Sequence, residues 1–219
     1  MADDCCNAVP VGTRNAVPPH YRRALWIALI VNVIMFGVEA AAGWRADSVS
    51  LLADAVDFFG DAANYGISLF VLSLAAVWRS RSALLKGLSM GAFGISVLGK
   101  TAWAIWHGVL PDAATMGVVG FIALLANVGV AALLYAYRNG DADMRSVWLC
   151  TRNDAIGNVA VILAALGVFG IGSAWPDLAV AVVMSLLSLT AAVSVLRQVS
   201  AELRAGRSTS LRDANRFGA

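Results

Sequence analysis

Six long apolar stretches, separated by short polar segments, follow one another along the chain. They predict helices over residues 23–44, 49–78, 83–107, 113–137, 145–169 and 177–199. Each stretch exceeds the roughly 20 residues that a helix needs to cross a bilayer. The pattern therefore predicts an all-α membrane protein, with a six-helix transmembrane bundle over residues 22–199. A flexible arm (residues 1–21) precedes the bundle, and a short basic tail (residues 200–219) follows it.

Composition supports a membrane protein and excludes several other classes. Hydrophobic residues make up 59% of the chain and charged residues 14%, whereas a soluble domain carries about 25% charged residues. A net charge of +2, with no basic stripe beyond the membrane edges, argues against a nucleic-acid partner. The first residues lack a basic segment followed by an apolar run, so they do not predict a signal peptide. The three cysteines are an odd number and a poor basis for a disulfide framework.

The distribution of basic residues predicts the orientation in the membrane. Basic side chains concentrate in the arm, the second and fourth predicted loops and the tail, while the opposite loops hold only Arg45. Because basic loops stay in the cytoplasm, we expect a multi-pass protein of the inner (cytoplasmic) membrane with both termini cytoplasmic. An even number of spans leads to the same arrangement of the termini.

The segment between Ser48 and Asn64 places three acids inside a predicted span. A carboxylate in hydrocarbon costs a few kcal/mol, so Asp54, Asp57 and Asp61 need a reason to be there. Asp57 and Asp61 are four residues apart and share one helix face, as two ligands of one cation would. The fifth predicted helix repeats this spacing with Cys150 and Asp154.

The two pairs are predicted to reach the same depth. At 1.5 Å per residue, Asp57 lies about 12 Å from one face and Asp154 about 13 Å from the other, both near the middle of the bilayer core. Three carboxylates and one thiolate suit tetrahedral Zn²⁺, and the thiolate disfavours Mg²⁺ and Ca²⁺ but admits Cd²⁺. We therefore predict a midplane metal site formed by Asp57, Asp61, Cys150 and Asp154.

Structural roles compete with this interpretation. The acids could pair with Lys100 and Arg152 inside the bundle, and Cys150 could be an inert buried residue. For Asp54 an ion pair with Lys100 is favoured over ligation, and Arg152 is assigned to Glu39 or another acid. Asn32 and Asn127 are expected to form interhelical hydrogen bonds. Gly87 and Gly91 form a Gly-x-x-x-Gly motif that predicts a close helix contact or a dimer seam. The N-terminal acids and thiols either capture a metal ion or are merely solvated: Asp3, Asp4, Cys5 and Cys6.

These residues together resemble the cation diffusion facilitator family of metal transporters. The resemblance is carried by Asn32, Glu39, Gly43 and the run 48–61, by Cys150–Asn158 and by Trp175–Asp177. It implies a homodimer that exports Zn²⁺ and similar ions, such as Cd²⁺ or Co²⁺, against protons, with the transport role at the four residues named above. Members commonly have His where this chain has Cys150, and many have His at the position of Asp57, which shifts the expected preference toward thiophilic ions. The sequence also looks like a short form without the family's cytoplasmic C-terminal domain or its His-rich loop, so a dimer would be held by membrane helices.

The sequence therefore predicts a proton–metal antiporter rather than an enzyme. Metal binding requires deprotonated ligands and so releases protons, which would couple metal exit to proton entry. Neither a His-Glu-x-x-His pair nor a Gly-x-Ser-x-Gly elbow occurs in the chain. The alternative is a non-transporting membrane subunit whose buried acids are structural.

Overall fold

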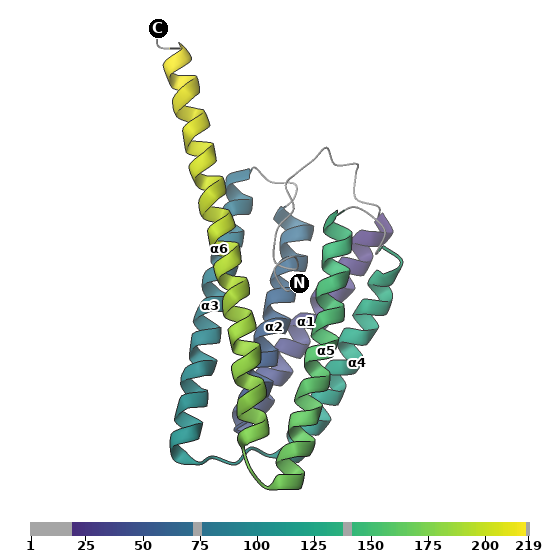
Figure 1. Cartoon of the computed structure of the whole chain (residues 1–219). Helices are drawn as coiled ribbons and strands as arrows, with labels where there is room; N and C mark the ends of the chain where they lie inside the picture. Colours follow the sequence, from purple (N-terminus) through teal and green to yellow (C-terminus); the bar gives the residue numbers. More distant parts are fainter. Residues whose placement is uncertain (1–18, 72–75, 138–141, 218–219) are drawn as a thin grey trace.

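The computed structural model describes residues 19–71, 76–137 and 142–217, and it shows a bundle of long helices (Figure 1). The predicted all-α membrane fold is confirmed. The helices are α1 (Pro19–Arg45), α2 (Val49–Gly66), α3 (Ala76–His107), α4 (Ala113–Tyr135), α5 (Ala142–Ile171) and α6 (Trp175–Phe217), with a π-helical turn η1 (Ile67–Val71) after α2. We call the end of the bundle where α1, α3 and α5 begin the upper end, and the opposite end the lower end, as they appear in Figure 1.

The outside of the bundle is apolar, as a lipid-facing surface must be. In the described part of the chain, α1, α4 and most of α3, α5 and α6 are long and apolar enough to cross a membrane. Large apolar side chains such as Ile34, Leu163 and Phe169 point outward. The three aspartates of α2 keep it out of this apolar set, but its side chains are mostly buried between the other helices. The chain is therefore a multi-pass membrane protein with a polar helix enclosed by apolar ones.

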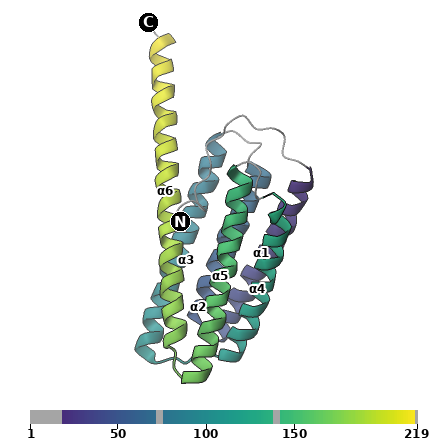
Figure 2. The ribbon, with the colours of Figure 1, turned by 45° about the vertical axis from the view of Figure 1, so that its right-hand side comes forward.

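Helix pairing places α2 at the centre. The most extensive contacts join α3 to α6, α4 to α5 and α1 to α2, and α2 also packs against α3, α5 and α6. Figure 2, turned by 45°, shows α3 and α6 along one side of the bundle and α4 and α1 along the other. A side chain on α2 can therefore reach either side.

The link between α2 and α3 falls inside the predicted second span. The sequence pattern predicted one helix over 49–78 and the next from residue 83, but α2 ends at Gly66 and α3 already begins at Ala76. The charge of the basic residues between 79 and 86 predicts a loop there. Arg, Lys, Ala and Leu are all good helix formers, so this segment extends α3 instead.

Helix α6 is also longer than predicted. It runs to Phe217, whereas the pattern ended the last helix near residue 199 and left the tail without structure. The added segment is rich in Arg and Ala and contains no proline, so its backbone favours a helix although it lacks the apolar content of a span. Figures 1 and 2 show it rising beyond the upper end.

Asp177, at the start of α6, caps the start of α2 at the lower end. Its carboxylate accepts hydrogen bonds from the amides of Val49 (3.0 Å) and Ser50 (3.1 Å) and from the hydroxyls of Ser48 (2.7 Å) and Ser50 (2.6 Å). A negative charge at a helix N-terminus satisfies unpaired amides and complements the helix dipole. The two helices are therefore joined where both begin.

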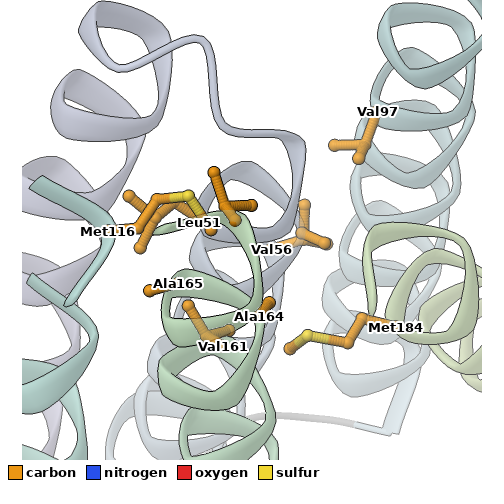
Figure 3. Packing of buried hydrophobic residues seen from close by; sticks show 10 residues of the cluster. Leu51, Val56, Val97, Met116, Val161, Ala164, Ala165 and Met184 are labelled. Atoms are coloured by element: carbon orange, nitrogen blue, oxygen red, sulfur yellow. The ribbon is translucent and has the colours of Figure 1, made fainter. Parts of the chain in front are cut away.

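Apolar packing fills the lower half of the bundle around α2. In Figure 3, side chains of α2 lie among those of α3, α4, α5 and α6, namely Leu51, Val56, Val97, Met116, Val161, Ala164, Ala165 and Met184. Glycines allow close approach at two helix pairs. A Cβ on Gly43 would lie 2.9 Å from Leu52 Cγ, and one on Gly87 would lie 3.2 Å from Leu196. The Gly-x-x-x-Gly face of α3 thus packs against α6 of the same chain. It forms a close helix contact within one protomer.

Candidate metal-transport site

Helix α2 carries the three acids on its buried surface. Asp54 and Asp61 are buried and Asp57 is partly buried. The N-cap at Ser48, whose hydroxyl accepts the Leu51 amide, fixes where the helix starts and hence where each acid lies along the bundle. The polar positions of α2 are therefore held from its lower end.

The carboxyl groups of Asp61 on α2 and Asp154 on α5 lie close enough to interact. Two ionised carboxylates in contact repel each other, so such a pair needs a cation between them, either a proton or a metal ion. The structure thus brings together one candidate residue from each of the two helices that the spacing had singled out.

Asp57 makes its contact in a different direction. The Ser188 hydroxyl on α6 donates a 2.8 Å hydrogen bond to Asp57 Oδ1. Asp57 and Asp61 both belong to α2, so this one helix presents one carboxylate toward α6 and a second carboxylate toward α5. A cation bound between them would contact the α3–α6 side and the α4–α5 side at once.

The fourth candidate, Cys150, has its side chain outside the described part of the structure. Its backbone lies on α5, one turn before Asp154. Among the side chains that are described, no group of three or more His, Cys, Asp or Glu residues is close enough to hold a metal ion. The four-residue site therefore stays a prediction.

The predicted ion pair between Asp54 and Lys100 is wrong. Lys100 Nζ lies 3.6 Å from Asp47 Oδ1 and 4.8 Å from the centre of the Trp44 ring, near the lower end. Asp54 instead lies close to Glu39, which is fully buried on α1. The short turn between α1 and α2 explains this contact, since both acids lie a similar number of residues from it. The side chain of Arg152, the expected partner of Glu39, lies outside the described residues.

Acceptor oxygens are in excess within the bundle. Within the described residues, side-chain oxygens of three acids and three amides are buried without a hydrogen-bond donor: Asn32, Glu39, Asp54, Asn127, Asp154 and Asn158. The Asn32 amide nitrogen donates a 2.8 Å hydrogen bond to the Ala28 carbonyl of its own helix, and not to another helix as expected. Buried acceptors without donors favour cations, whether protons or metal ions, in their neighbourhood.

Three polar side chains at the acids were not identified from the sequence. They are Ser188, Tyr65 and Thr151. Ser188 forms a hydrogen bond with Asp57, and Tyr65 forms hydrogen bonds with both Asp61 and Thr151. Tyr65 stands four residues after Asp61, and this spacing was the available signal. Ser188 and Thr151 gave no signal, because serine and threonine are common in membrane helices.

Comparison with known proteins gives a consistent set of relatives. The cation efflux transmembrane domain model matches residues 25–203. The chain is 24% identical over 80% of its length to a cadmium, cobalt and zinc/H(+)-K(+) antiporter of Bacillus velezensis, of which the match covers 61%. It is 24% identical over 84% of its length to the zinc transporter ZitB of Yersinia pestis, covering 63% of that protein. It is 31% identical over 61% of its length to metal tolerance protein 1 of Arabidopsis thaliana, covering 39% of that protein.

The matches leave part of each relative uncovered. The chain spans less than two thirds of the length of these three proteins. All the acids described above lie within residues 25–203, which the transmembrane domain model matches.

Proposed function

The chain belongs to the cation efflux family, and on that premise we propose that it exports a divalent metal ion across a membrane in exchange for protons. The observation that carries the proposal is the contact between Asp61 and Asp154, two acids from separate helices inside an apolar bundle. A site that must hold a cation to be stable suits a carrier of cations. The names of the relatives, which include zinc, cadmium and cobalt, support Zn²⁺ and similar ions as the substrate.

We assign the substrate ion to Asp57, Asp61, Cys150 and Asp154. Three carboxylates and one thiolate provide four ligands, the number that Zn²⁺ prefers, and the thiolate favours Zn²⁺ and Cd²⁺ over Mg²⁺ and Ca²⁺. The order on the helices supports this set, because Cys150 is one turn before Asp154 on α5 and Asp57 is one turn before Asp61 on α2.

Exchange with protons follows from the ligand chemistry. The metal binds deprotonated carboxylates and thiolate, so loading releases protons on the side from which the metal enters. Protons that take the place of the metal on the other side release it there. The Asp61–Asp154 pair can be bridged by either cation, which lets the same two side chains serve both halves of the cycle.

Movement of helix groups would expose the site to each side in turn. Helices α3 and α6 pack most extensively on each other, as do α4 and α5 and also α1 and α2, which gives groups that can rock around a central site. We place the upper end in the cytoplasm of a cell with an inner membrane, since most basic residues of the sequence gather there. A homodimer held by membrane helices completes the proposal.

Zinc flux into proteoliposomes tests the proposed function. With a zinc dye and a pH dye inside the vesicles, we expect zinc entry together with a rise of internal pH, because protons leave as zinc enters. Asp57→Ala should lower the flux at least tenfold. Asp112→Ser is the control, because Asp112 is an exposed helix cap outside the bundle and serine caps equally well.

Each outcome has a clear meaning. Wild-type protein without zinc flux would favour the alternative of a non-transporting subunit with structural acids. Zinc flux without a change of internal pH would contradict the exchange with protons. Full activity of Asp57→Ala would remove Asp57 from the site.

A further inference from the structure

Tyr65 joins the two helices that carry the proposed ligands. Its hydroxyl group donates a 3.0 Å hydrogen bond to Asp61 Oδ2 on α2 and lies 2.7 Å from Thr151 Oγ1 on α5. A phenol has one proton to donate. Since Tyr65 gives that proton to Asp61, the Thr151 hydroxyl is the donor in the second bond. The result is a directed chain from Thr151 to Tyr65 to Asp61.

The ring of Tyr65 is fixed by apolar packing. It is 1% exposed and belongs to a cluster near the upper end with residues of α1 and α4, namely Tyr21, Ala24, Leu25, Ala28, Val130 and Leu134. Packing on several sides prevents the ring from swinging away from Asp61. The hydroxyl group is therefore held at one place relative to the carboxylate.

A fixed donor on one carboxylate oxygen sets the direction of the other. Asp61 Oδ2 accepts the Tyr65 hydrogen bond, and the carboxyl group of Asp61 also interacts with that of Asp154 on α5. Removing a group that hydrogen-bonds a metal-binding carboxylate typically lowers metal affinity about tenfold to hundredfold. Thr151 lies directly beside Cys150, so the same bond also ties the α5 ligands to the α2 ligands.

We propose that Tyr65, held by Thr151, is a positioning residue that orients Asp61 for the transported metal ion. The proposal rests on the proposed function and adds to it a determinant of metal affinity on the upper side of the site. Tyr65 does not bind the metal itself. Its effect passes through Asp61, and it depends on the hydroxyl group rather than on the ring.

Tyr65→Phe is the direct test, because it removes one oxygen and keeps the packed ring. Using the full chain and Zn²⁺ as the probe, we expect a dissociation constant and a flux KM at least tenfold higher than wild type, with the maximal rate within about twofold. Thr151→Val should shift both constants in the same direction by a smaller factor. Thr151→Ser, which keeps a hydroxyl group, should restore wild-type values.

A control and a double variant separate positioning from a general effect on folding. Tyr21→Phe removes a hydroxyl group from the same apolar cluster and should leave zinc affinity unchanged. Because Thr151 acts through Tyr65, the variant Tyr65→Phe/Thr151→Val should bind zinc as Tyr65→Phe alone does. Independent, multiplicative losses in the double variant would contradict the directed chain.

The outcomes distinguish this inference from the proposed function. A wild-type chain that neither binds nor transports zinc would overturn both. Zinc transport by wild type, with wild-type affinity and KM in Tyr65→Phe, would overturn the role of Tyr65 alone. A loss of affinity in Tyr21→Phe equal to that in Tyr65→Phe would also overturn it, since the effect would then belong to the cluster.

Discussion

Ser188 is the side chain through which α6 reaches an acid of the proposed site. It is buried, and its hydroxyl group donates to Asp57 Oδ1 at 2.8 Å. Hydrogen bonds to charged groups contribute about 1.5–3 kcal/mol, more than bonds between neutral groups. A metal ion that takes the other oxygen of Asp57 would find this carboxylate already oriented.

We expect Ser188→Ala to weaken zinc binding about tenfold, because Asp57 loses the donor that orients it. Isothermal titration of the purified chain measures the dissociation constant. Ser185→Ala is a matched control on the same helix, since the Ser185 hydroxyl group is equally buried and makes no hydrogen bond within the described residues. Equal effects of the two substitutions would show that packing of α6, and not the bond to Asp57, matters.

At the residue scale the sequence identifies acids better than their partners. The cost of charge in a bilayer made Asp57, Asp61 and Asp154 stand out without any structure. Their neighbours could not be found in this way, because which faces meet depends on how the helices are rotated and packed. Lys100 illustrates the problem: its depth suggested Asp54, whereas its packing against Trp44 directs it to Asp47.

At the scale of elements, the start of α2 depends on the start of α6. Asp177 accepts four hydrogen bonds from Ser48, Val49 and Ser50 and is almost fully buried. In the lower half of the bundle this contact and the apolar packing around Leu51 and Val56 hold α2 in position. The register of α2, and so the depth of its acids, is set there.

Asp177→Asn should destabilise the fold by about 1–3 kcal/mol, because an amide nitrogen would face backbone amides that need an acceptor. A lower melting temperature in detergent, together with reduced zinc flux, is the expected result. Asp112→Asn is the control, since Asp112 caps α4 locally and asparagine is an equally good N-cap. An unchanged melting temperature for Asp177→Asn would mean that the cap contributes little to stability.

Helix boundaries were predictable where proline, glycine or acid marks the end of an apolar stretch. Both bounds of α1 and α5 and the start of α4 fall within a few residues of expectation. The sequence pattern places the charged segments at the start of α3 and the end of α6 outside the helices. The structure differs because charge excludes a segment from the bilayer but not from a helix. Hydropathy therefore predicts the spans better than the helices that contain them.

At the scale of the whole molecule, the two ends of the bundle differ in charge. The starts of α1, α3 and α5 and the long end of α6 lie at the upper end, and these segments hold most basic residues of the chain. The lower loops are short and nearly free of basic side chains. This asymmetry predicts which end faces the cytoplasm.

Single cysteines placed at the two ends test this orientation. In a chain whose three native cysteines are replaced by serine, Leu110→Cys lies at the lower end and Ala136→Cys at the upper end, and both positions are exposed. A membrane-impermeant thiol reagent added to intact cells should label Leu110→Cys and leave Ala136→Cys unlabelled until the cells are opened. The reverse pattern would contradict the orientation.

The cap at Asp177 also has a consequence for synthesis. The amides and hydroxyl groups that it satisfies leave the ribosome about 127 residues before it does. Until the last helix is made, the Val49 and Ser50 amides lack their acceptor, and α2 carries three acids that a lipid environment disfavours. A nascent chain interrupted before α6 would therefore hold an unfinished helix, and such chains should be the ones that membrane proteases remove.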